Sequence, residues 1–124
     1  MNSNPPPKNA EMIINSLIDI CVEGWRFGRL FIRILAKLDA EDAARHINQF
    51  RYYQKRIDES LESVGMRLVN IEGQPYEPGT AATALNISDF EPNDRLFVDQ
   101  MIEPIIMSSD GVIKTGTVML RKAE

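Results

Sequence analysis

Apolar side chains recur at regular intervals over the first third of the chain, and this pattern predicts a long helix. From residue 10 to about residue 38, apolar or small residues are separated alternately by four and three positions: Ile14, Ile18, Cys21, Trp25, Gly28, Ile32 and Leu35. This heptad spacing is typical of helices that pack on other helices. A neighbouring row of Leu17, Gly24, Phe31 and Leu38 repeats every seventh residue, and two adjacent rows favour a bundle.

A second heptad pattern follows after a link of a few residues. Asp39 is suited to cap a helix from Ala40 to about Val64, and Gly65 is suited to end it. The apolar positions again alternate by three and four, and their one polar member, Gln54, is expected to fix register: Ile47, Phe50, Gln54, Ile57, Leu61 and Val64. Because the link is short, the two helices should form an antiparallel hairpin.

The pattern changes to short strands after Gly65. Runs rich in Val, Ile and Leu predict strands at 66–71, 82–87, 96–102, 105–107, 112–114 and 117–120, and residues 108–111 have the chemistry of a hairpin turn. The expected fold class is α+β. A proline-rich, disordered leader (1–9) should precede a helical dimerisation region (10–65) and a small, mostly antiparallel β domain (66–124).

The two helical seams predict a homodimer. A lone hairpin would leave apolar surface in water, whereas two hairpins paired in a four-helix bundle would bury it at roughly 25 cal/mol per Å². Glycines at 24 and 28 would allow close helix packing. The expected dimer interface consists of Ile14, Ile18, Cys21, Trp25, Ile32, Leu35, Ile47, Phe50, Ile57 and Leu61.

Charge and composition limit the classes of binding partner that the protein is expected to have. The net charge of -4 argues against nucleic acid, which needs a basic footprint on some face of the protein. No apolar stretch is long enough to predict a membrane span, and a single cysteine fits a reducing compartment, so we expect a cytoplasmic protein with no membrane partner. Basic residues along the first helix (Arg26, Arg29, Arg33 and Lys37) are expected to pair with acids of the second helix, such as Glu59 and Glu62, rather than to contact RNA.

Residue types that support catalysis are sparse. His46 is the one histidine and has no companion ligands, and Cys21 lies in the heptad seam, where packing is favoured over reactivity. Asp99 and Glu103 are expected to be structural or surface carboxylates. The dispersed glycines form no phosphate-binding loop. The sequence therefore predicts a binding protein rather than an enzyme, with no metal and no cofactor.

The order of these parts resembles the GrpE-type nucleotide exchange factors of DnaK-type chaperones. The similarity runs from SLIDICVEGWRF (16–27) through DESLESVGMRLVNIEGQPYEP (58–78) to DGVIKTGTVMLRK (110–122). Gly65 and Pro78 fall on family positions, and Lys114 takes the place of an arginine. Gln49 stands where the family commonly has a glycine. The resemblance implies a short member that lacks the long N-terminal coiled coil of the family.

The resemblance also implies a function. The β domain would bind the nucleotide-binding domain of a DnaK-type chaperone, favour its open state and thereby promote ADP release. By position in the family pattern, the partner-binding residues are Ile102, Lys114 and Leu120. The residues themselves leave an alternative open at each position, since Ile102 and Leu120 equally suit the sheet core and Lys114 suits a solvated surface. An alternative function is a dimeric adaptor with this fold that binds a specialised chaperone-like ATPase without general exchange activity.

Overall fold

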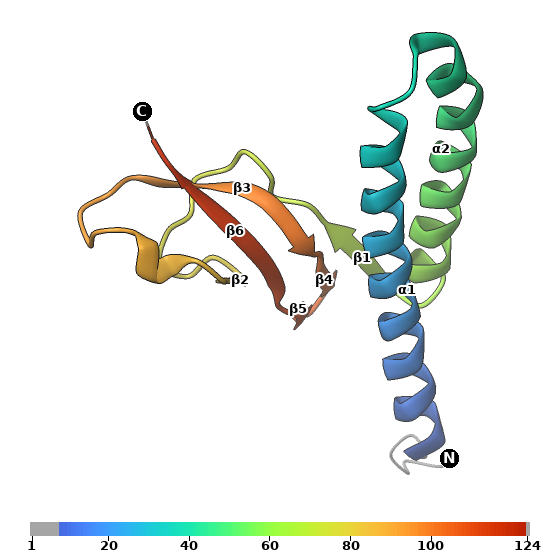
Figure 1. The fold of residues 1–124 in the computed structure, drawn as a ribbon. Coiled ribbons are helices and arrows are strands. Elements are labelled where there is room, and N and C mark those ends of the chain that lie inside the picture. Colours follow the sequence, from blue (N-terminus) through green and yellow to red (C-terminus); the bar gives the residue numbers. More distant parts are fainter. Residues whose placement is uncertain (1–7, 124) are drawn as a thin grey trace.

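A computed structural model describes residues 8–123 and places a helical hairpin beside a small β domain (Figure 1). The hairpin consists of α1 (Lys8–Leu35) and α2 (Ala40–Glu62). The β domain follows, with these elements: β1 (Met66–Val69), β2 (Ala82–Ala84), the short 3-10 helix η1 (Ile87–Asp89), β3 (Leu96–Glu103), β4 (Ile105–Ser108), β5 (Gly111–Lys114) and β6 (Gly116–Lys122). The expected α+β class is confirmed. Residues 1–7 of the expected leader lie outside the described residues, whereas Lys8 and Asn9 belong to α1.

The hairpin turn follows from local capping. α1 ends at Leu35, three residues earlier than expected, because the backbone of Lys37 and Leu38 turns back on Ile34 and Leu35. The Asp39 side chain then accepts a hydrogen bond of 2.8 Å from the Asp42 N–H and so caps the start of α2. Beyond the other end of α2, Gly65 has a φ of 79°, the left-handed conformation that favours glycine.

Two glycines of α1 set the distance between the helices. A Cβ at Gly24 would lie 2.5 Å from the Tyr53 hydroxyl oxygen, and a Cβ at Gly28 would lie 3.1 Å from Cε1 of Phe50. Both contacts are tighter than ordinary van der Waals packing. The prediction of close helix packing at these glycines is confirmed, and the helix that approaches them is α2 of the same chain.

The strands form two three-stranded sheets. In one, β4 pairs with both β1 and β5, and all strands are antiparallel. In the other, β6 lies in the centre, antiparallel to β3 and parallel to β2. The expected description of the β domain as mostly antiparallel therefore holds, and β2 is the parallel member.

Two strands are shorter than predicted, and each is ended by a contact with a residue distant in the sequence. β2 ends at Ala84 because the Asn86 amide bonds both the N–H and the C=O of Leu120, at 2.9 and 3.0 Å, and so takes the groups of β6 that a longer strand would pair. β1 ends at Val69, opposite Ile105, because Pro104 precedes that partner and has no N–H to donate.

The core joins the hairpin to the β domain. One cluster surrounds Trp25 of α1 with residues of the β domain: Ile71, Ala82, Val98, Met101, Ile105, Val118 and Leu120. A second cluster combines α1, α2 and the first sheet: Ile18, Cys21, Val22, Leu61, Met66 and Ile106. Because α1 contributes to both clusters, the two predicted regions share one interior and are not separately packed units.

Candidate interaction surfaces

Helix α1 has an inward face that is buried within the single chain. We define it as Ile18, Cys21, Val22 and Trp25, each no more than 7% exposed. Burial also raises the pKa of the Cys21 thiol. The prediction that the dimer interface includes Ile18, Cys21, Trp25, Leu35 and Leu61 therefore needs correction, because their own chain already buries all five side chains. The heptad seam is real, but the β domain and α2 fill it.

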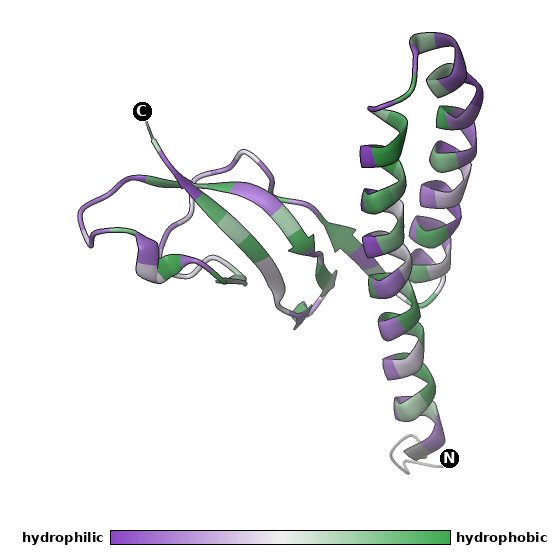
Figure 2. Ribbon diagram, viewed as in Figure 1, coloured by the Kyte–Doolittle hydropathy of each residue, from purple (hydrophilic) through white to green (hydrophobic). Residues whose placement is uncertain are grey.

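A second apolar row runs along α1 and into the turn that follows it. Its exposed members face away from the core, whereas Leu17 packs against the second core cluster and Gly24 faces Tyr53 of α2. We call this row the outward stripe, and its members again alternate by four and three: Ile13, Leu17, Ile20, Gly24, Phe27, Phe31, Ile34 and Leu38. Ile13, Ile20 and Phe27 are about two-thirds exposed, at 67%, 71% and 65%. Figure 2 shows hydrophobic residues, in green, along the whole length of α1, including the segment that extends beyond the end of α2. Such a continuous apolar surface is typical of an interaction site.

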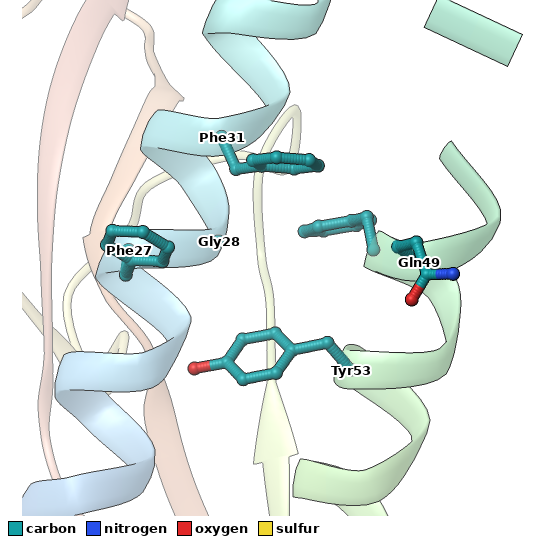
Figure 3. Close-up of a pocket in the computed structure, with 6 residues that line it drawn as sticks. Phe27, Gly28, Phe31, Gln49 and Tyr53 are labelled. Atoms are coloured by element: carbon teal, nitrogen blue, oxygen red, sulfur yellow. The ribbon is translucent and has the colours of Figure 1, made fainter. Parts of the chain in front are cut away.

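The outward stripe borders an aromatic groove between the two helices (Figure 3). The groove has a volume of about 300 Å³ and is lined by Phe27, Gly28 and Phe31 of α1 and by Gln49, Phe50 and Tyr53 of α2. Phe31 and Tyr53 point into the space between the helices (Figure 3). Phe50, a predicted interface residue, therefore lies on a solvent-accessible surface. The remaining predicted interface residues are also at least partly exposed: Ile14, Ile32, Ile47 and Ile57.

The sequence pattern identified only part of this surface. The row of Leu17, Gly24, Phe31 and Leu38 is one half of the outward stripe, and Ile13, Ile20, Phe27 and Ile34 supply the other half at the same period. Gln54, expected to be the buried polar residue of the seam, is exposed on α2. The polar groups that line the aromatic groove are the Gln49 amide and the Tyr53 hydroxyl.

Basic residues of α1 form ion pairs with the β domain. Arg29 Nη2 donates to both carboxylate oxygens of Glu72, at 2.6 and 2.7 Å, while its guanidinium lies 5.3 Å from the centre of the Trp25 ring. Glu72 also accepts a hydrogen bond of 3.2 Å from the Met101 N–H. Arg26 lies 3.3 Å from Glu23 of its own helix and 3.9 Å from Glu103 of the β domain.

The expectation that these arginines pair with acids of the second helix was therefore wrong. Glu59 instead pairs with Arg56 of its own helix at 3.6 Å. The reason is the position of the β domain, which packs on the side of α1 that carries Arg26 and Arg29. Spacing along one helix defines which residues share a face, but it does not identify the element that covers that face.

The three positions expected to bind a partner have different surroundings. Leu120 is only 4% exposed and lies in the core cluster with Trp25, so the sheet-core alternative holds for this residue. Ile102 on β3 and Lys114 at the end of β5 are half-buried. The structure adds two exposed neighbours of Lys114, Val112 and Ile113, on a strand that pairs on one side only. We call Val112, Ile113 and Lys114 the β5 edge.

The rest of the described chain offers few groups for chemistry. Within residues 8–123, no three His, Cys, Asp or Glu side chains gather where they could hold a metal ion. His46 is exposed on α2. None of the helices that the structure describes is both long and apolar enough to cross a membrane. What the described surfaces offer to a ligand is apolar contact area with flanking charge.

No protein-family model, no curated protein and no solved structure matches this chain.

Proposed function

We propose that this protein is a homodimeric, GrpE-like co-chaperone that binds the nucleotide-binding domain of a DnaK-type chaperone and promotes ADP release. The observation that carries the proposal is the outward stripe, a heptad row with exposed Ile13, Ile20 and Phe27 on a hairpin that leads directly into a small β domain. Support also comes from the three sequence motifs with family resemblance, which lie on α1, on the α2–β1 junction and on the successive strands β5 and β6, although these two strands belong to different sheets.

In this proposal, two copies pack their outward stripes and aromatic grooves together as a four-helix bundle. Each fully buried Ile or Phe side chain contributes about 1.5–3 kcal/mol relative to its exposed state, so burial of several such residues is the driving force that the proposal assigns to dimerisation, against the cost of association. The charges of Arg26 and Arg29 are paired within the chain, with Glu23 and Glu103 for Arg26 and with Glu72 for Arg29.

The β5 edge would provide the contact with the chaperone. Val112 and Ile113 are apolar, nearly half-exposed and adjacent to Lys114, a combination of anchor and flanking charge that suits protein recognition. A partner that binds the open state of an ATPase more tightly than its closed state shifts the population toward the open state. A tenfold shift of the closed–open equilibrium requires a differential affinity of about 1.4 kcal/mol. The same proposal assigns the protein to the cytoplasm, in keeping with its lone, buried cysteine.

Release of a fluorescent ADP analogue from the host's DnaK-type chaperones tests this function. We expect the wild-type protein to accelerate release and the variants K114E and V112E to lose that effect. Lys55 is exposed on α2, away from the β5 edge, so K55E makes the same charge reversal and should retain full activity. Light scattering and circular dichroism must first show that each variant keeps the wild-type mass and fold. Equal loss in K55E, or no loss in K114E and V112E, would contradict the assigned contact.

One observation favours the alternative of a dimeric adaptor for a specialised chaperone-like ATPase. Leu120, one of the three positions that the family resemblance assigns to the partner contact, is buried in this chain, so the family contact is not fully present on the surface. A correctly folded dimer that accelerates ADP release from none of the host's general chaperones, yet binds another ATPase of the same fold, would support the adaptor.

A further inference from the structure

The edges of the two sheets differ in what covers them. Residues 73–76 run along β3 and form three backbone hydrogen bonds with it, of 2.8 to 2.9 Å. At β2, the Tyr76 hydroxyl donates a hydrogen bond of 3.1 Å to the carbonyl oxygen of Ala82. β1 follows α2 and packs against it. β5 pairs with β4 on one side, and within residues 8–123 no backbone hydrogen bond joins β5 to any other segment.

The open edge of β5 favours one kind of occupant. Along an edge strand, the N–H and C=O groups that do not bond to the neighbouring strand point outward. Ile113 adds to this edge, because it is the extra residue of a β-bulge and has no partner on β4. A partner that excludes water from the edge must supply both donors and acceptors at the spacing of a backbone, and an extended strand does so.

The side chains of β5 lie on both faces of the sheet. Val112 is opposite Met107, and Lys114 is opposite Ile106. Because Ile106 and Met107 are successive residues of β4, their side chains point to opposite faces, and those of their two partners do so too. A partner that lies against one face of the sheet would contact only one of the two β5 side chains. A strand along the edge would contact both, because it has side chains on both faces.

Exposure and charge define the chemistry of the added strand. Val112 is 47% exposed, and Lys114 forms no ion pair with any residue in the described part of the chain. An apolar residue beside Val112 and a carboxylate beside Lys114 would complement both. Two β5 strands from two copies of this chain would not do so. Their in-register pairing places Lys114 beside Gly111 when antiparallel and beside a second Lys114 when parallel.

We propose that the partner binds the β5 edge by strand addition. An extended segment of the partner, with an apolar residue beside Val112 and an acidic residue beside Lys114, becomes a fourth strand next to β5. This inference rests on the contact that the proposed function assigns to the β5 edge, and it adds the conformation and chemistry of the bound segment. In this mode of recognition, main-chain hydrogen bonds supply affinity and alternate side chains supply specificity.

Amide hydrogen exchange tests the backbone contact. The probe is the host's DnaK-type chaperone, free of nucleotide, added to the full-length wild-type protein. Binding should slow exchange of the β5 amides that do not bond to β4 by about tenfold or more, because these amides become hydrogen-bonded. Mass spectrometry with fragmentation measures exchange along the strand. A contact made by side chains alone would leave these amides exchanging at their original rate.

Two substitutions at one position separate the backbone from the side chain. I113P removes an N–H from the edge and should weaken chaperone binding by about tenfold, whereas I113A keeps the N–H and should weaken binding less. Proline is tolerated in edge strands, and circular dichroism must show that the variant keeps the wild-type fold. If I113P does not fold, the exchange experiment on the wild-type protein decides the proposal.

S109P provides the matched proline control. Ser109 is exposed in the turn between β4 and β5, at the second position of that turn, which favours proline. S109P should therefore bind the chaperone like the wild type.

The outcomes separate this inference from the proposed function. Unchanged exchange along β5 in a complex that forms, or equal losses of binding in I113A and folded I113P, would overturn strand addition and leave the proposed function standing. Protection of β5 that appears without the chaperone and increases with protein concentration would assign the edge to a second copy and overturn the inference too. Failure to bind any of the host's DnaK-type chaperones would overturn both the inference and the proposed function.

Discussion

The two apolar faces of α1 have the same periodicity, but one is buried within the chain and the other is exposed to solvent. The inward face is closed within the chain, where Trp25 packs among residues of the β domain. The outward stripe, rotated around the same helix, leaves Ile20 and Phe27 in contact with water. Hydrophobicity and spacing do not distinguish the two faces. What differs is the position of the β domain, which covers one face and leaves the other open.

This comparison separates two kinds of information in a heptad pattern. The pattern states that a helix will bury a face, because apolar side chains at this spacing cannot all remain in water at no cost. It does not state whether the covering element comes from the same chain or from another. Variants on the two faces should therefore differ in how their effect on stability depends on protein concentration. The effect of a variant on the inward face should not depend on concentration, whereas that of a variant on the outward stripe should.

The largest expected effect comes from truncation of the inward face. W25A should lower the free energy of unfolding by about 3–5 kcal/mol, because it opens a cavity in the core that joins α1 to the β domain. F27A removes an aromatic ring two positions away on the same helix. In dilute, monomeric protein it should change stability by no more than about 0.5 kcal/mol. Urea unfolding measures both, and similar losses in the two variants would show that the faces are not distinct.

A charge on the outward stripe should have the next largest effect, on assembly rather than folding. I20E places a carboxylate where two copies would meet and should shift the mass in solution from twice the chain mass of 14.1 kDa toward a single copy. N15E introduces the same charge at an exposed polar position on α1 and should leave the mass unchanged. Light scattering over a range of concentrations measures both. A dimer that survives I20E would have its interface elsewhere.

The ion pairs between α1 and the β domain should give a smaller effect. E72Q weakens the two-oxygen contact with Arg29 and should cost about 1–2 kcal/mol, reduced from the value for a fully buried pair because both side chains are partly exposed. E103Q weakens a contact of 3.9 Å with the more exposed Arg26 and should cost less than E72Q. Thermal unfolding ranks the two variants, and the reverse order would contradict the assigned importance of the Arg29–Glu72 pair.

The smallest effect concerns the ionisation of Cys21. Burial raises the pKa of this thiol above its ordinary value of 9.0, so the folded state binds the proton more tightly than the unfolded state. The corresponding contribution to stability is complete below pH 9.0 and is lost as the pH rises through the folded pKa. The wild-type protein should therefore lose stability in alkaline solution more steeply than C21A. Parallel curves of stability against pH for the two proteins would show that the thiol contributes nothing.

Local patterns in the sequence predicted most of the fold. Asp39 and Gly65 marked helix ends through their capping chemistry, and the runs of Val, Ile and Leu after Gly65 located the strands. Errors arose where a distant group intervened. β2 is short because Asn86 bonds the backbone of Leu120, and no local signal connects residues 34 positions apart.

The candidate surfaces were predicted less well for the same reason. Trp25 and Phe27 are both aromatic and nearly adjacent, and only the packing of the β domain shows which one is core. Leu120 belongs to the central strand of a sheet, a position set by long-range pairing with β2 and β3. Lys114 stays near the surface because β5 pairs on one side only. Surface properties of this kind depend on which strands become neighbours, and a linear pattern does not contain that information.

The central place of β6 in its sheet has a consequence for the order in which the protein is made. Synthesis produces the helical hairpin first, yet the strand that connects β2 to β3, and supplies Val118 and Leu120 around Trp25, is the last of the six that the structure describes. Until β6 leaves the ribosome, the cluster around Trp25 lacks Val118 and Leu120, so this part of the inward face is not fully covered. The nascent chain therefore exposes part of its apolar core until the last of these strands is made, and such exposure favours aggregation.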